Sequence, residues 1–148
     1  EETPVEETAA EPTYTVSETL TRPVPGEVMT EFSDTPVYSE TMRDYRVHAG
    51  TDYTAAHGET VHACANGIVK ETHTDMLRGN MIVIEHGDYE VRYCGLGETF
   101  LVHEGDVVTA GQDIGSVTAA PFESALDSHL HIEVTRNGEP VDPESVFG

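Results

Sequence analysis

Two short pieces of the sequence combine imidazole and carboxylate side chains at spacings that suit metal chemistry. His48 and Asp52 are four residues apart, and His129 and His131 are two residues apart. Successive side chains of an extended chain point to opposite faces, so residues two or four apart share a face. Two imidazoles and one carboxylate are a standard ligand set for an open zinc site, in which water takes the fourth position. The two pieces are therefore candidates for a metal site.

Short histidine motifs also occur without a metal. The H-x-H and H-x-x-x-D patterns are brief, and solvated surface histidines produce them as well. Calcium and magnesium prefer sites with more oxygen ligands, whereas nickel, cobalt and copper accept the same histidine and carboxylate donors as zinc. Taken alone, these residues leave both a metal site and ordinary histidines open.

The surrounding sequence predicts short strands and tight turns. Residues 80–86 are rich in β-branched side chains, and residues 89–94 follow them after Gly87-Asp88, which indicates a hairpin. Residues 128–135 alternate between apolar and polar side chains and run into Asn137-Gly138, a second hairpin signal. No segment has a long 3.6-residue apolar period. We therefore predict an all-β fold, an antiparallel sheet of sandwich-like or barrel-like form, with little helix.

Composition divides the chain after residue 25. Residues 1–25 hold six Glu, four Pro and one Arg, a composition that disfavours a packed core. We expect the first 12 or so residues to be a flexible acidic tether. The stretch from Tyr14 to Pro25 is expected to lie against the domain through Val16 and Leu20, and residues 26–148 are expected to form one globular domain.

The charge balance excludes several partners. The chain has 28 acidic residues, seven Lys and Arg, and a formal net charge of −21. Such a charge argues against binding nucleic acid or anionic lipid, both of which require cations on the protein. No apolar run approaches the roughly 20 residues of a membrane helix. We expect any membrane anchor to lie upstream of this sequence.

The chain has two cysteines, Cys64 and Cys94. Two cysteines are too few for a disulfide scaffold. We favour buried free thiols, with a single disulfide between them as the alternative.

From residue 26 onward the chain resembles the M23 (LytM-type) zinc metallopeptidase family. The resemblance rests on the successive blocks HAGTD, VHACANGIV, GNMIVIEHGDYEVRYCGL, VHEGDVVTAGQDIGSV and SHLHIEVTRNGEPVDP. It implies a small antiparallel β domain with one zinc ion per chain, held by His48, Asp52 and His131. It also implies that His129 is a catalytic residue and that the substrate is a peptide bond of peptidoglycan, often next to glycine.

One position departs from the pattern of active members of this family. They carry a second catalytic histidine in a Tyr-x-His-Leu block, which here reads Tyr93-Cys94-Gly95-Leu96. Glycine has no side chain that moves a proton or donates a hydrogen bond. Loss of one such group typically lowers a rate by roughly 10²–10³-fold. If this were the only deficiency, Gly95→His should raise hydrolysis of a glycine-linked peptide.

The segment before the first motif departs as well. Residues 36–48 lack the Gly-Phe-Gly-x-Arg stretch usual in the enzymes and resemble members like stage II sporulation protein Q. This resemblance implies an anchor in the forespore membrane and a mother-cell channel protein as partner across the intermembrane space. The acidic residues 1–25 would then be a spacer.

Three functional readings follow. The first is a zinc-binding docking module with weak or absent hydrolysis, and the second is a working zinc endopeptidase acting on peptidoglycan. The third is a fold relic without metal. We favour the first because the metal ligands are present while the usual histidine at position 95 is missing. No remaining histidine has a spacing that marks it as a replacement, and His86 is expected to be structural.

Overall fold

The computed structural model of the chain describes residues 13–147. Within this range it is built of strands and two short 3₁₀ turns. In chain order they are β1 (Val28–Thr30), β2 (Ser33–Ser39), β3 (Asp44–His48), β4 (Thr51–Thr54), β5 (Thr60–His62), β6 (Gly67–Asp75), β7 (Gly79–His86), β8 (Tyr89–Leu96), β9 (Val107–Val108), β10 (Asp113–Ser116), η1 (Pro121–Glu123), β11 (His129–Arg136), β12 (Glu139–Val141) and η2 (Pro143–Ser145).

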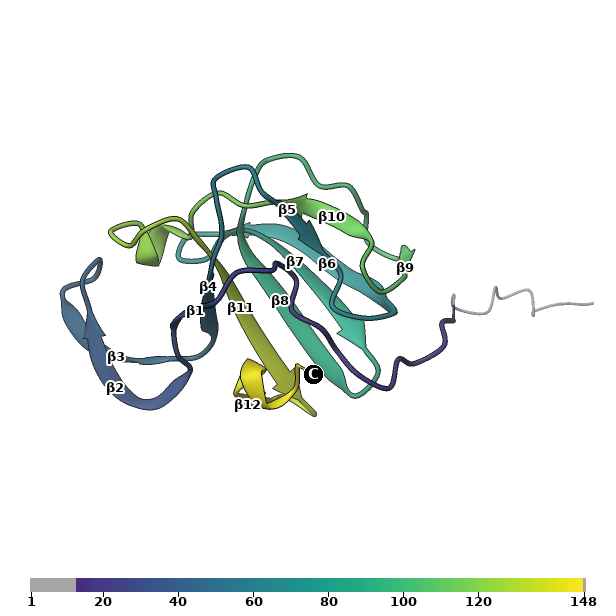
Figure 1. Ribbon diagram of the computed structural model, residues 1–148, viewed down its shortest axis with the longest axis horizontal. Helices are drawn as coiled ribbons and strands as arrows, with labels where there is room; N and C mark the ends of the chain where they lie inside the picture. The colour runs from purple at the N-terminus through teal and green to yellow at the C-terminus, as the bar shows by residue number, and fades with distance from the viewer. Residues whose placement is uncertain (1–12, 148) are drawn as a thin grey trace, which may run out of the picture.

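One large sheet organises the domain (Figure 1). Its eight strands run in the order β1-β4-β11-β8-β7-β6-β9, with β12 paired to β11. Every pairing between these strands is antiparallel. The all-β antiparallel prediction is therefore confirmed. Among the described residues no helix is long and apolar enough to cross a membrane.

The hairpin predictions also agree with the structure. β7 and β8 pair across Gly87-Asp88, and β11 and β12 pair across Asn137-Gly138. Asn137 and Gly138 both have positive φ, 52° and 84°, which a two-residue turn of the I′ type requires.

The two faces of the large sheet differ in character. One face packs on the main core, to which the small β5–β10 sheet contributes Val61 and Ile114. The alternation expected in residues 128–135 places Leu130, Ile132 and Val134 in that core, each fully buried. The side chains between them point to the opposite face, where the histidines lie.

The segment before residue 26 is packed against the domain. Leu20 and Val24 are 4% and 1% exposed and belong to the main core. The hydroxyl of Tyr14 donates a hydrogen bond to Glu85 at 2.6 Å. Val16, expected to be an anchor, is instead 59% exposed, and Val24 takes that role. The residues expected to form a flexible tether, 1–12, lie outside the described part of the chain.

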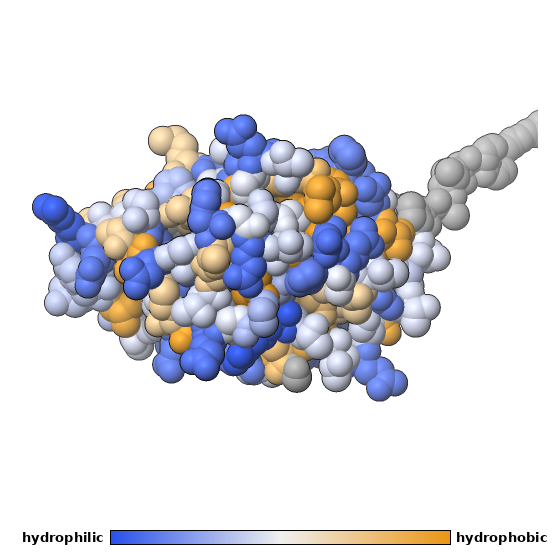
Figure 2. Space-filling view, turned by 45° about the horizontal axis from the view of Figure 1, so that its top comes forward, coloured by the Kyte–Doolittle hydropathy of each residue, from blue (hydrophilic) through white to orange (hydrophobic). Residues whose placement is uncertain are grey.

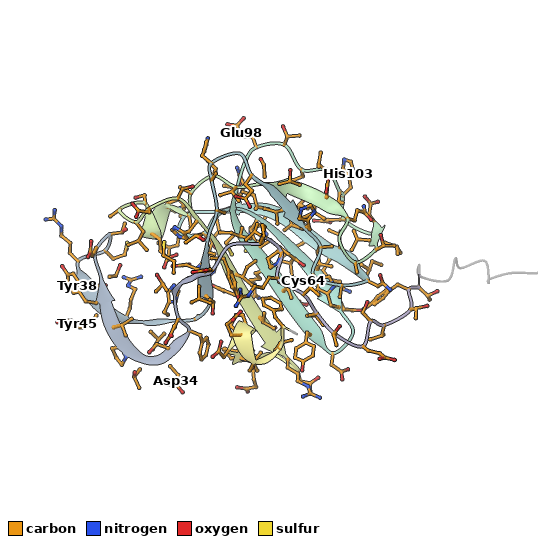
Figure 3. The ribbon with its side chains drawn as sticks, viewed as in Figure 1. Asp34, Tyr38, Tyr45, Cys64, Glu98 and His103 are labelled. Carbon is orange, nitrogen blue, oxygen red and sulfur yellow. The ribbon has the colours of Figure 1, made fainter. Side chains whose placement is uncertain are left out.

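Strands β2 and β3 form a separate hairpin that stands off from the large sheet (Figure 1). The ring centroids of Tyr38 and Tyr45 are 5.3 Å apart, and both side chains lie at its outer side (Figure 3). Tyr45 is 74% exposed and Val47 is 51% exposed. Elsewhere, on the face that Figure 2 presents, apolar side chains appear as small spots among hydrophilic ones.

Candidate metal centre

Strand pairing brings the candidate ligands together on one face of the sheet. β3 ends at His48, and after a two-residue break β4 begins and carries Asp52. β4 pairs with β11 so that Asp52 is directly opposite His131. Paired residues in adjacent strands point to the same face. The two sequence motifs, 79 residues apart between Asp52 and His131, therefore meet at one place.

The groups at this place are buried and close to one another. His48, Asp52, His129 and His131 are at most 6% exposed. Nδ1 of His131 is 2.7 Å from Oδ1 of Asp52, and Nε2 of His48 is 3.3 Å from Oδ2 of Asp52. A fourth group, the carboxylate of Glu123 in η1, faces the same point. One ligand atom from each of His48, Asp52, Glu123 and His131 lies within 4.8 Å of the others.

Each inward-facing imidazole is held from behind by an acceptor. Nδ1 of His48 lies 2.9 Å from the carbonyl oxygen of Glu31. Nε2 of His131 lies 3.0 Å from Oε2 of Glu133, which in turn accepts a hydrogen bond from Nε of Arg78 at 2.9 Å. Acceptors of this kind orient the histidine ligands of metals and fix their tautomer.

These contacts suit either two protons on each ring or one metal ion between the rings. A carbonyl or carboxylate faces both ring nitrogens of His48 and of His131, so each ring needs two protons when no cation is bound. A metal replaces the inner proton and leaves the outer N–H to donate. The buried Oδ2 of Asp52 has no hydrogen-bond partner, although Nε2 of His48 lies 3.3 Å from it. A buried polar atom without a partner needs an explanation, and a bound ion supplies one.

The local charge also suits a divalent cation. The three buried carboxylates of Asp52, Glu123 and Glu133 and the one guanidinium of Arg78 sum to −3 + 1 = −2 when the imidazoles are neutral. Burial lowers the pKa of His48, but the neighbouring carboxylates of Asp52 and Glu123 outweigh burial and raise it to about 9. When no cation is bound, a proton on the imidazole of His48 therefore offsets part of the negative charge of the carboxylates.

His129 lies beside the ligands. Its Nδ1 is 2.7 Å from the carbonyl oxygen of Asp127, which orients the ring. Its Nε2 points inward, 3.1 Å from Oε1 of Glu123 and 3.7 Å from Oδ1 of Asp52. This nitrogen therefore faces the same point as the candidate ligands.

Sequence reasoning missed Glu123, Glu133 and Arg78. Glu133 could have been found, because it is two residues after His131 in the same alternating strand and shares its face. Glu123 and Arg78 come from loops, where no periodic pattern shows which way a side chain points.

Cys94 also faces the site, since it is paired with His131 across β8 and β11. Cys94, His131 and Glu133 form a second cluster of possible ligands. Arg78 already balances Glu133 in this cluster, and burial raises the pKa of the Cys94 thiol to about 12. This second cluster is therefore a weaker candidate for a metal than the cluster on the Nδ1 side of His131. Both cysteines are free and buried, as expected.

Gly95 is the extra residue of a β-bulge. Leu96 is paired with Asn80 and Cys94 with Met81, so Gly95 has no partner on β7. Its φ is +76°, and a Cβ atom there would lie 2.7 Å from the backbone nitrogen of Ala120. The position cannot accept a side chain without moving the segment at Ala119 and Ala120. The expectation that Gly95→His raises hydrolysis stays a prediction, although the added side chain has to displace that segment.

The family comparison agrees with the antiparallel all-strand fold. Residues 46–143 match the family model described as peptidase family M23. The chain belongs to this family.

Relatives and solved structures add detail. The peptidoglycan DD-endopeptidase ShyA of Vibrio cholerae is 35% identical over 96 residues, which are 64% of this chain and 22% of that protein. A zinc-containing peptidase from Vibrio cholerae has a TM-score of 0.70 at 27% identity, covering 87% of this chain and 39% of that one. A chain of the SpoIIQ–SpoIIIAH pore-forming complex has a TM-score of 0.75 at 22% identity, and the match covers 88% of this chain and 91% of that one. At this level of identity, the similarity to the SpoIIQ–SpoIIIAH structure shows a shared fold and nothing more.

The chain spans about a quarter of the length of the curated relatives it matches.

Proposed function

We propose that the chain is the zinc-binding M23 domain of an extracytoplasmic protein of the cell envelope, with weak or absent peptidase activity. One zinc ion is held by Nε2 of His48, the carboxylate of Asp52 and Nδ1 of His131. The observation that carries the proposal is the pair of acceptors on each of these imidazoles. Zinc, when bound, polarises a carbonyl group and lowers the pKa of a bound water.

Hydrolysis is weakened because one proton-moving group is missing. His129 supplies an oriented imidazole at the site. The second imidazole of active members would stand at Gly95, where the backbone of Ala120 leaves no room for a side chain. Loss of one such group lowers rates by roughly 10²–10³-fold.

The opposing candidate is a working endopeptidase of peptidoglycan. Two observations favour it: the inward-facing Nε2 of His129 and a curated relative that is a peptidoglycan DD-endopeptidase. A cleft of about 160 Å³ also runs between the β2–β3 hairpin and η1 and is lined by His48 and Glu123. The cleft therefore lies beside the proposed metal site.

A release assay separates the two candidates. The zinc-reconstituted protein is incubated with intact peptidoglycan, and soluble fragments are counted with and without a chelator. ShyA serves as the positive control and His129→Ala as the matched variant. We expect zinc to be retained and release to be at least about 100-fold slower than with ShyA. Chelator-sensitive release at a rate comparable with ShyA would establish the enzyme instead.

We also propose that the domain docks a partner protein, with a channel protein of the SpoIIIAH type as the candidate. Support comes from the likeness to the SpoIIQ–SpoIIIAH complex and from the exposed apolar side chains on the β2–β3 hairpin. The assignment to sporulation and to the forespore membrane belongs to this proposal. Co-elution with a purified SpoIIIAH-type domain tests it. Binding should weaken in the double variant Tyr38→Ser, Tyr45→Ser, and a failure of the unmodified chain to bind would end this part of the proposal.

A further inference from the structure

The loop between β10 and β11 inserts one carboxylate into the metal centre. Glu123 is the last residue of η1 and is 6% exposed. Its Oε2 lies 2.7 Å from Nε2 of His48, and its Oε1 lies 3.1 Å from Nδ1 of His131. Both nitrogens are the inward-facing ones. Glu123 thus stands in the same relation to the two imidazoles as Asp52 does, at 3.3 and 2.7 Å.

These separations suit the ligands of one small cation. In a tetrahedral zinc site with bonds of about 2.0–2.1 Å, ligand atoms are about 3.3 Å from one another. The four contacts that join Asp52 and Glu123 to the two imidazoles, 2.7, 2.7, 3.1 and 3.3 Å, are at or slightly below that length, as expected where hydrogen bonds substitute for metal bonds.

The loop that carries Glu123 is fastened on both sides of η1. The backbone nitrogen of Thr118 donates to the carbonyl oxygen of Gly95 at 2.7 Å, before η1. After η1, the backbone nitrogen of Ala125 donates to the hydroxyl of Thr41 in the β2–β3 hairpin at 2.9 Å. Ala120 approaches β8 where Gly95 has no side chain. The glycine that replaces a histidine is therefore also what lets this loop lie close enough to place Glu123.

We propose that Glu123 is a fourth metal ligand supplied by the chain itself. The inference rests on the proposed zinc site of His48, Asp52 and His131 and deepens it. Structural zinc sites are closed by four protein ligands, whereas catalytic sites keep one position open for water or substrate. With Glu123 in place the centre is of the closed kind. The open position that peptide hydrolysis needs is filled until the η1 loop withdraws.

The test compares the variant Glu123→Gln with the unmodified chain. Glu98→Gln, which makes the same chemical change at an exposed position, is the control. Glu98 is an exposed glutamate at the edge of the domain (Figure 3). Zinc affinity is measured by competition with a chromogenic chelator, and coordination by the visible spectrum of the cobalt-substituted protein. Loss of a group that only orients a ligand weakens metal binding by about 10–100-fold. Loss of a ligand should cost no less, so we expect Glu123→Gln to weaken zinc binding at least about ten-fold. Because the set of ligands changes, the cobalt spectrum should change as well. Glu98→Gln should change neither.

A second measurement asks whether an added anion reaches the metal in the unmodified chain. Azide is added to the cobalt-substituted, unmodified chain. A closed site predicts no change in the spectrum at concentrations that alter it in Glu123→Gln. The proposal is overturned if Glu123→Gln keeps the affinity and spectrum of the unmodified chain, even if hydrolysis falls, because Glu123 is then a base or a structural acid. It is also overturned if azide binds the unmodified chain. Absence of zinc from the unmodified chain would instead refute the proposed function.

Discussion

At the scale of residues, the centre consists of ionisable groups that the fold buries in contact with one another. An unpaired buried charge is strongly destabilising, and here every carboxylate of the centre faces an imidazole or a guanidinium. Glu133 illustrates the arrangement: burial raises its pKa, but His131 and Arg78 outweigh burial and hold the pKa at about 2. Removal of any one member leaves its neighbours unmatched.

Replacement of a proposed ligand should remove both metal and the stability it adds. In His131→Ala we expect stoichiometric zinc to be lost, because Nδ1 of this ring contacts both Asp52 and Glu123. At free zinc about 100-fold above the dissociation constant, the lost stabilisation is about 2.7 kcal/mol. Metal analysis and thermal unfolding check this. His103→Ala, in an 88% exposed side chain at the domain edge (Figure 3), is the control. An unchanged zinc content in His131→Ala would refute the assignment.

Restoring a histidine at position 95 should harm the domain. Gly95→His places a side chain on a backbone with φ +76° and against the nitrogen of Ala120. A residue held in such a region costs about 1–3 kcal/mol, to which the steric contact adds. We expect a lower free energy of unfolding in urea and no gain in hydrolysis. Gly105→His, at a similar φ of +89° but in open space, separates backbone strain from the contact. A stable and more active Gly95→His would contradict this account.

At the scale of elements, β8 and β11 contribute to two different environments. On one face their side chains build the main core, and on the other face they line the metal centre. On the core side, Tyr93 of β8 forms a buried pair with His86 of the neighbouring strand β7. Nε2 of His86 is 2.8 Å from the hydroxyl of Tyr93, and its Nδ1 is 3.1 Å from the carbonyl oxygen of Asn66. This pair fastens the end of β7 to the loop before β6, so His86 is structural, as expected from the sequence.

The buried His86 should make the domain sensitive to acid. Burial lowers the pKa of His86 from 6.5 to about 4. The unfolded chain therefore binds a proton more readily, and stability is lost as pH falls from 6.5 toward 4. Between pH 7.5 and pH 5 the loss from this group is about 2 kcal/mol. In His86→Gln the change in unfolding free energy over this range should be smaller by that amount. Equal slopes in the two proteins would show that His86 is not held neutral.

The segment before β1 should contribute to stability. Leu20 is 4% exposed and pairs through its backbone with Phe147 near the other end of the chain. Leu20→Ala should lower the free energy of unfolding by about 2–4 kcal/mol. Val16→Ala, at a side chain that is 59% exposed, should stay within about 0.5 kcal/mol. Urea unfolding of the two variants checks the prediction, and equal effects would show that the segment is not anchored at Leu20.

The elements could be predicted to different degrees. The β7–β8 and β11–β12 hairpins follow from local alternation and from the turns Gly87-Asp88 and Asn137-Gly138. The meeting of the two histidine motifs depends on the pairing of β4 with β11, which strand patterns do not specify and which came from the family resemblance. The position of Glu123 and the bulge at Gly95 depend on a loop packed against β8. Loop packing leaves no period in the sequence, so neither was foreseen.

At the scale of the whole molecule, excess negative charge and a buried metal centre act together. A net charge of −21 gives a field that attracts cations and favours their approach to the domain. Counting only partners within residues 13–147, five of the seven basic side chains lie within 4.0 Å of an acidic one: Arg22, Arg46, Lys70, Arg78 and Arg136. Among them, Arg78 serves the metal centre itself. At the proposed cation site, the carboxylates of Asp52, Glu123 and Glu133 outnumber the single guanidinium of Arg78.

The metal content of the purified chain tests the central claim most directly. The protein is reconstituted with zinc, freed of unbound metal, and analysed by mass spectrometry for zinc per chain, before and after dialysis against a chelator. The account predicts one zinc per chain, removed by the chelator with a fall in thermal stability. A chain that folds but retains no zinc after reconstitution would contradict it, and the histidines would then mark a centre that has lost its metal.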